Sequence, residues 1–210
     1  MDAFLERLQG FWHEATGIWS EGGWAMIAIA VISVVLFGIG VSVHLRLRST
    51  GFQSVPEATW RRWIEHPGER RGRIGELLGY VAGGRSVQET STVFEQVRTT
   101  ETVPFDRDLR VMKICVGAAP LVGLLGTVTG MLATFSALSS GSGGDKTMGM
   151  IASGISEALV TTETGLVIAL AGLFYQYQLV RKHERYRAFL AHLESVCAQA
   201  VYRQQQKAVA

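Results

Sequence analysis

The chain has 210 residues, of which 48% are hydrophobic and 18% charged, and its formal net charge is only +2. A nearly neutral chain of this kind offers no strongly basic surface, so we expect no nucleic acid as a partner. The hydrophobic content instead indicates an integral membrane protein of modest size.

Residues 1–22 place apolar side chains at helical spacing, with acidic and polar residues between them. Two of the apolar residues are tryptophans, which favour the membrane–water interface. This pattern predicts an amphipathic helix on the membrane surface, and the alternative is a frayed polar end. The apolar positions are Phe4, Leu5, Leu8, Trp12, Ala15 and Trp19.

Three segments are long and apolar enough to cross a bilayer, whose hydrocarbon core of roughly 30 Å takes about 20 helical residues. The first, residues 23–44, contains the uncharged run Trp24–Val43. It lacks the basic start and small-residue cleavage site of a signal peptide, so we expect it to be retained. The second span covers residues 111–138 and the third covers residues 153–180. The fold class predicted is therefore an all-α integral membrane protein with three transmembrane helices.

Basic residues gather at one end of each predicted span, and the opposite ends have little positive charge. By the positive-inside rule, we expect the N-terminus and a short loop at 139–152 outside the membrane, and residues 45–110 and 181–210 on the cytoplasmic side. The basic residues are Arg46, Arg48, Arg107, Arg110, Lys113, Arg181, Lys182, Arg185 and Arg187.

The two cytoplasmic segments have the composition of long helical extensions. Pro56, Pro67 and Pro104 are expected to divide the first segment into short helices, whereas the tail can continue the third span as one helix. Neither segment has a Gly-rich phosphate loop, a nucleophile motif or a metal-spaced His/Cys cluster. We therefore expect no enzyme activity, no cofactor and no metal. Ordinary surface or interface roles are expected for His44, His66, His183 and His192.

The third span carries polar side chains in its first half. An acid inside a membrane span is costly and by default marks an ion or proton path. Hydroxyl groups suit such a path because they both donate and accept hydrogen bonds. We therefore expect this helix to line something polar. The side chains concerned are Glu157, Thr161, Thr162, Glu163 and Thr164.

The second span is rich in glycine and threonine near one helical face. Small residues let helices approach closely in lipid, where packing drives association. Packing explains the threonines less well, although a threonine hydroxyl can bond a carbonyl of its own helix. For Thr127 and Thr162, a packing role with the hydroxyl bonded to the backbone stays open as the alternative. Helix packing is expected at Gly123, Gly126, Gly130 and, on the third span, Gly165.

Two motifs in these spans carry a family resemblance. Residues 119–130 read APLVGLLGTVTG, and residues 154–162 read GISEALVTT and continue to Gly165 and Leu166. Both resemble the motifs of the MotA/TolQ/ExbB proton-channel family. Three spans and a large segment between the first two resemble ExbB and TolQ more than MotA, which has four spans.

The resemblance implies a motor subunit of the bacterial inner membrane. Family members form a pentamer around a dimer of single-span partners, ExbD or TolR, and use the proton gradient. By motif position, Thr127 and Thr162 would line the proton path, and Glu157 matches the family's glutamate. The function implied is an ExbB-like subunit that, with an ExbD-like partner, energises a TonB-type transducer for outer-membrane transport. A TolQ-like role in envelope maintenance and a non-conducting membrane scaffold are the alternatives.

The sequence departs from the family pattern at Glu163 and Ala171. Glu163 stands where ExbB usually has a small apolar residue. It is either a protonated structural residue that faces a neighbouring subunit and bonds a span-two hydroxyl such as Thr129 or Thr134, or a second proton site. For Glu157, proton conduction and a subunit contact near the periplasmic mouth are both open. Ala171 replaces the usual proline, so we expect a straighter third span.

Overall fold

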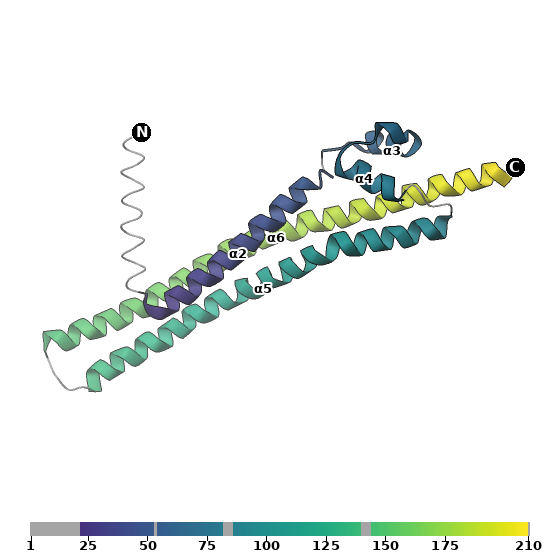
Figure 1. The fold of residues 1–210 in the computed structure, drawn as a ribbon. Helices are drawn as coiled ribbons and strands as arrows, with labels where there is room; N and C mark the ends of the chain where they lie inside the picture. The colour runs from purple at the N-terminus through teal and green to yellow at the C-terminus, as the bar shows by residue number, and fades with distance from the viewer. Residues whose placement is uncertain (1–21, 53, 82–85, 140–143, 210) are drawn as a thin grey trace, which may run out of the picture. The chain divides into compact units, whose positions relative to one another are not determined.

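The computed structural model describes residues 22–209 except residues 53, 82–85 and 140–143. Every regular element in this part of the chain is helical, which confirms the all-α prediction. The expected amphipathic helix at 1–22 falls almost entirely outside the described residues. The elements are α2 (Gly23–Ser49), α3 (Glu57–Glu65), the short 3-10 helix η1 (Pro67–Glu69), α4 (Gly72–Val81), α5 (Val87–Ser139) and α6 (Asp145–Val209) (Figure 1).

Three of these helices, α2, α5 and α6, are long and apolar enough to cross a membrane. Their number and order are those predicted from hydropathy. Helix α6 already begins at Asp145, so part of the segment expected to be a loop, 139–152, is helical.

Helix α5 continues through Pro104, and the expectation that this proline would end a short helix is wrong. Proline lacks the N–H that would bond the carbonyl four residues earlier. That carbonyl belongs to Thr100, which is exposed, so water can take the place of the missing donor.

The chain divides into two compact units. The first consists of Met1–Gly38 and Val111–Tyr175, and the second of Ile39–Arg110 and Gln176–Ala210. The division between Arg110 and Val111 falls where the sequence analysis places the start of the second span. Helices α2, α5 and α6 each contribute residues to both units.

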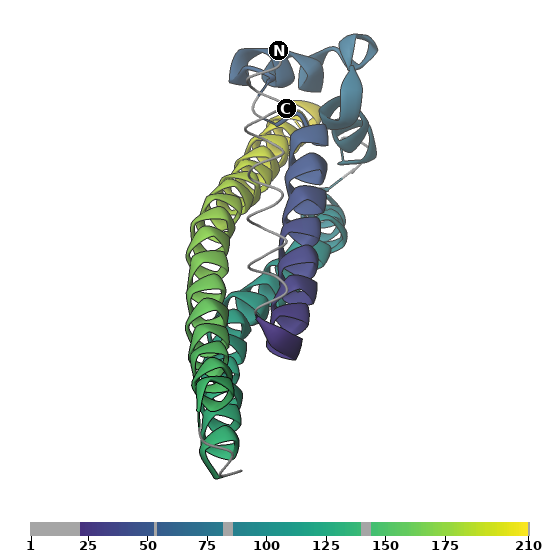
Figure 2. The same cartoon turned by 90° about the vertical axis from the view of Figure 1, so that its left-hand side faces the viewer.

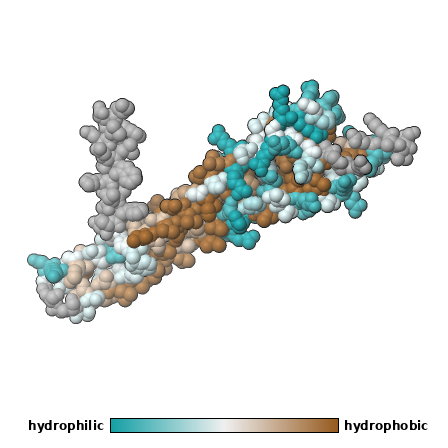
Figure 3. Space-filling view, viewed as in Figure 1, coloured by the Kyte–Doolittle hydropathy of each residue, from teal (hydrophilic) through white to brown (hydrophobic). Residues whose placement is uncertain are grey.

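In the first unit, the apolar parts of α2, α5 and α6 pack together. Leu36 of α2 is fully buried, and its side chain fills the space beside Gly172 of α6. The rings of Phe37 and Tyr175 stack with centroids 6.3 Å apart. Large apolar side chains also cover the outside of these helices (Figure 3). A continuous apolar exterior is typical of a surface that faces lipid or further chains.

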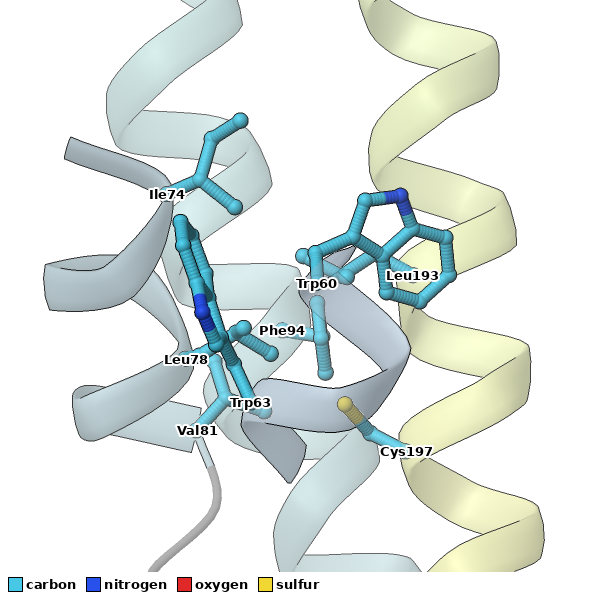
Figure 4. Packing of buried hydrophobic residues seen from close by; sticks show 8 residues of the cluster. All are labelled: Trp60, Trp63, Ile74, Leu78, Val81, Phe94, Leu193 and Cys197. Carbon is cyan, nitrogen blue, oxygen red and sulfur yellow. The ribbon is translucent and has the colours of Figure 1, made fainter. Parts of the chain in front are cut away.

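In the second unit, α3 and α4 lie beside the C-terminal part of α6, as Figures 1 and 2 both show. Figure 4 shows Trp63 among side chains of α4, and Trp60 beside Leu193 of α6. Phe189 of α6 meets the Trp60 ring edge-on at 6.1 Å. This core packs α3 and α4 against α5 and α6. Its buried residues are Trp60, Trp63, Ile74, Leu78, Val81, Phe94, Leu193 and Cys197.

Candidate functional site

The two family motifs meet where α5 and α6 pack in the first unit. A Cβ atom added to Gly130 would lie 2.6 Å from the carbonyl oxygen of Gly154. One added to Gly165 would lie 2.7 Å from the carbonyl oxygen of Ala119. Since carbon and oxygen atoms cannot approach so closely, the two backbones can lie at this separation only with glycine at these positions. Gly123 and Gly126 lie at the same contact.

Thr161 is the polar side chain at the centre of this contact. It is 0% exposed, and its side chain occupies the space beside Gly126. Its hydroxyl lies 2.9 Å from the carbonyl oxygen of Glu157 and 3.1 Å from that of Ala158, both on its own helix. The family motifs assign roles to Thr127 and Thr162 but none to Thr161. Its helical phase with Gly154, Ala158 and Gly165 is the signal that identifies it as buried.

Thr162 joins the two helices. Its hydroxyl oxygen lies 3.1 Å from the carbonyl oxygen of Gly123 on α5 and 3.1 Å from that of Ala158 on α6. One hydroxyl proton serves only one acceptor at a time, so the two carbonyls share this donor. Thr162 as a whole is half-buried.

Thr127 lies one helical turn beyond Gly123 and is half-buried. Its hydroxyl donates to the carbonyl oxygen of Leu124 at 2.6 Å. Thr129 and Thr134 also donate to carbonyls of their own helix, at 3.0 Å and 2.7 Å. Thr127 and Thr162 therefore belong to the same helix pair, but each hydroxyl has its own backbone partner.

Glu157, on α6, lies beside the start of α2. A Cβ added to Gly23 would collide with the Glu157 carboxyl oxygen, and Gly23 has a φ of +55°, which favours glycine. The half-buried Glu157 side chain therefore rests against the backbone of the first residue of α2.

Glu163 lies on the face of α6 that points away from α5. Helical periodicity puts it within about 40° of Leu159 and Leu170 and roughly opposite Thr161. Leu159, Glu163 and Leu170 are all exposed. Among the residues that the structure describes, Glu163 is thus an exposed carboxyl group beside exposed leucines.

The second unit holds a buried histidine that is paired with a half-exposed aspartate, a pairing that the sequence did not indicate. His183 is 2% exposed, and its Nε2 lies 2.9 Å from Oδ1 of Asp106. Burial lowers the pKa of His183, although hydrogen bonding to Asp106 opposes the shift. Its Nδ1 has no hydrogen-bond partner among the described residues. Of the surface and interface roles expected for the histidines, His183 therefore has an interface role, between α5 and α6. The helical phase of His183 with Leu179, Tyr186 and Leu190 is the signal that indicates its burial.

The second unit also contains an ion pair between Arg73 and Glu101. The Tyr186 hydroxyl donates to Oε2 of Glu101 at 3.3 Å, and Arg73 bonds the other carboxyl oxygen at 3.0 Å. Burial and the neighbouring Glu101 carboxylate raise the pKa of Tyr186.

Among the described residues, no group of three or more His, Cys, Asp or Glu side chains is arranged to hold a metal ion.

Comparison with known proteins gives relatives with ExbB-type names. A biopolymer transport protein ExbB-like 1 of Synechocystis sp. is 38% identical over 87 residues, which cover 41% of this chain and 34% of the relative. ExbB-like 3 of the same organism is 35% identical over 92 residues, 44% of each chain. An ExbB homolog of Methanothermobacter thermautotrophicus is 28% identical over 180 residues, 80% of this chain and 63% of the relative. The matches thus cover between about a third and just under two thirds of these relatives.

Residues 71–191, more than half of the chain, match the MotA/TolQ/ExbB proton channel family. The matched region contains both motifs and the glycine-lined contact between them, which confirms the resemblance found in the sequence. With three helices long and apolar enough to span a membrane, the chain is a multi-pass membrane protein that belongs to the MotA/TolQ/ExbB proton channel family.

Proposed function

We propose that the chain is an ExbB-like subunit of a motor driven by the proton gradient across the bacterial inner membrane. With an ExbD-like single-span partner, it energises a TonB-type transducer for outer-membrane transport. The supporting observation is the α5–α6 contact, where both family motifs meet and the Thr162 hydroxyl lies between carbonyls of two helices.

Thr127, Thr162 and Glu157 are the groups proposed to line the proton path. A hydroxyl can accept a proton on one side while it donates on the other. The half-buried Thr162 already has two alternative acceptors, 3.1 Å away in each case. The gradient supplies only about 2.3 kcal/mol per charge per 100 mV, so each mechanical step would use several protons.

Assembly with further chains is part of the proposal. By family resemblance, five copies would surround a dimer of the single-span partner. The exposed Glu163 supports an assembled state, because a charge facing lipid near the middle of a span costs about 3 kcal/mol or more. A neighbouring copy, the partner helix or a water-filled pore would remove that cost.

One observation favours a second candidate, a non-conducting membrane scaffold. The hydroxyls of Thr127, Thr161 and Thr164 all donate to carbonyls of their own helices. This is what threonines do when their role is helix packing alone. A TolQ-like motor shares the proposed chemistry, and only its partners would distinguish it.

Native mass spectrometry of the complex, extracted gently from its own membranes, tests the proposal. We expect several copies of the chain together with a single-span partner that carries an aspartate in its span. A co-purifying TonB-like protein would support the proposed output, and a TolA-like protein would replace it with the envelope role. A homo-oligomer without any single-span partner would contradict the motor and favour the scaffold.

A further inference from the structure

A basic cavity of about 220 Å³ lies in the second unit beside the end of α2. A second hollow of about 150 Å³ shares three of its residues. Phe52 forms part of the wall and is held there by ring contacts with Tyr186 and Phe189, at 5.3 and 6.0 Å. The cavity therefore has a fixed apolar side as well as a basic one. Its lining residues are His44, Leu47, Arg48, Phe52 and Lys182.

The basic side chains of this cavity have no carboxylate partner in the part of the chain that the structure describes. Arg46, only two residues before Arg48, contrasts with them. Its guanidinium lies 3.3 Å from Asp108 and 4.9 Å from the centre of the Phe105 ring. Neighbouring cations without a counter-charge repel each other, so an anion in the cavity would stabilise Arg48 and Lys182 together.

The cavity lies where the apolar parts of α2 and α6 end. The uncharged run Trp24–Val43 has 20 residues, and at 1.5 Å per residue it spans about 30 Å, the thickness of the hydrocarbon core. His44 follows this run directly. On α6, Arg181 is the first basic residue after the span, and Lys182 comes next. Both sides of the cavity therefore reach the depth of the lipid headgroups, whichever way the chain is oriented.

We propose that this cavity binds the phosphate group of an anionic membrane lipid. The Arg48 guanidinium can hold two phosphate oxygens at once, and Lys182 adds a compact positive charge. An imidazole N–H of His44 can donate to a third oxygen. Leu47 and Phe52 offer an apolar surface for the first carbons of the lipid. Free phosphate has the same charge chemistry, but the depth of the cavity favours a lipid, and basic pockets between membrane helices are known to bind such headgroups.

Native mass spectrometry of the full-length complex in mild detergent tests this site. The probes are phosphatidylglycerol and phosphatidylcholine with identical acyl chains, titrated separately. The test variant is Arg48→Gln with Lys182→Gln. The control, Arg181→Gln with Arg185→Gln, removes the same charge from exposed residues that do not line the cavity.

We expect the wild type and the control to bind phosphatidylglycerol more tightly than phosphatidylcholine. The test variant should lose about 30-fold in affinity for phosphatidylglycerol, because each basic side chain contributes about 1 kcal/mol near an anionic lipid. The single variants Arg48→Gln and Lys182→Gln should each lose part of the affinity for phosphatidylglycerol, so the site remains testable if the double variant fails to fold.

Three results would overturn the proposal. One is equal binding of both lipids by the wild type, and another is unchanged phosphatidylglycerol binding by the test variant. The third is displacement of the lipid by millimolar inorganic phosphate, which would assign the cavity to a soluble anion.

Discussion

The Thr162 hydroxyl is the one group of the predicted proton path that contacts both family motifs, through Gly123 on α5 and Ala158 on α6. Valine has nearly the shape of threonine but neither donates nor accepts. We therefore expect Thr127→Val with Thr162→Val to abolish transport driven by the proton gradient. Each lost hydroxyl bond costs about 1 kcal/mol, which is too little to unfold the chain.

The measurement is energy-dependent uptake in cells, with the size of the complex determined in parallel. Thr92→Val is a suitable control, since the Thr92 hydroxyl also donates to its own helix but lies in the second unit. Normal uptake by a well-assembled double variant would exclude the two hydroxyls from the path.

His183 makes the second unit sensitive to acid. Burial lowers its pKa below the ordinary value of 6.5, so the unfolded chain binds a proton at a higher pH than the folded one. Protonation therefore favours unfolding, and this contribution to stability is lost as the pH falls below about 6.5. We expect the melting temperature of the wild type to fall more between neutral and mildly acidic pH than that of His183→Gln.

Thermal unfolding of both proteins across this pH range provides the measurement. The glutamine amide can still donate to Asp106 but does not titrate, so the comparison isolates the histidine. Parallel pH profiles of the two proteins would exclude His183 as the source of the acid sensitivity.

At the level of helices, the α5–α6 contact should tolerate no added methyl group. A Cβ at Gly165 would lie 2.7 Å from the Ala119 carbonyl oxygen, and backbone cannot move aside as a flexible side chain can. We expect Gly165→Ala to destabilise the chain by about 1–3 kcal/mol. Gly117→Ala, also on a long helix, meets nothing within 4 Å and should be neutral or stabilising by up to about 1 kcal/mol.

Unfolding in a defined detergent micelle measures both glycine variants. A Gly165→Ala protein as stable as Gly117→Ala would mean that the two helices do not approach as closely as described. The paired design matters because alanine raises helix propensity at both positions equally, so the difference reports the contact alone.

Hydropathy was sufficient to predict the three long helices, because a bilayer requires long apolar runs whose backbone bonds are satisfied internally. It did not predict that α5 would pass Pro104, since that depends on the exposure of the Thr100 carbonyl. Nor did it separate Thr161 from Thr162. Two adjacent threonines have the same hydropathy, and the burial of Thr161 is indicated only by its helical phase with Gly154, Ala158 and Gly165. The link that Thr162 makes between helices depends on the position of α5.

At the scale of the whole molecule, the open question is whether lipid or protein covers the apolar exterior of the first unit. The carboxyl group of Glu163 on this exterior distinguishes the two. Glu163 lies on the α6 face that also exposes Leu159 and Leu170. If lipid covered this face, replacement of the acid by leucine would be favourable, since a charge near the middle of a span costs about 3 kcal/mol. If another chain or a pore covers it, the carboxyl has a partner that leucine would lose.

We expect Glu163→Leu to stabilise the chain when it is expressed alone and to weaken its assembly with the single-span partner. Glu163→Gln keeps the size and hydrogen-bonding capacity of the side chain, so it should preserve both assembly and transport if the role is structural. Melting temperature and complex mass, each measured with and without the partner, give the two readouts. A Glu163→Leu complex at least as stable as the wild-type complex would mean that Glu163 faces lipid. A Glu163→Gln complex that assembles fully but transports nothing would instead assign proton transfer to this carboxyl, because only its ability to ionise has been removed.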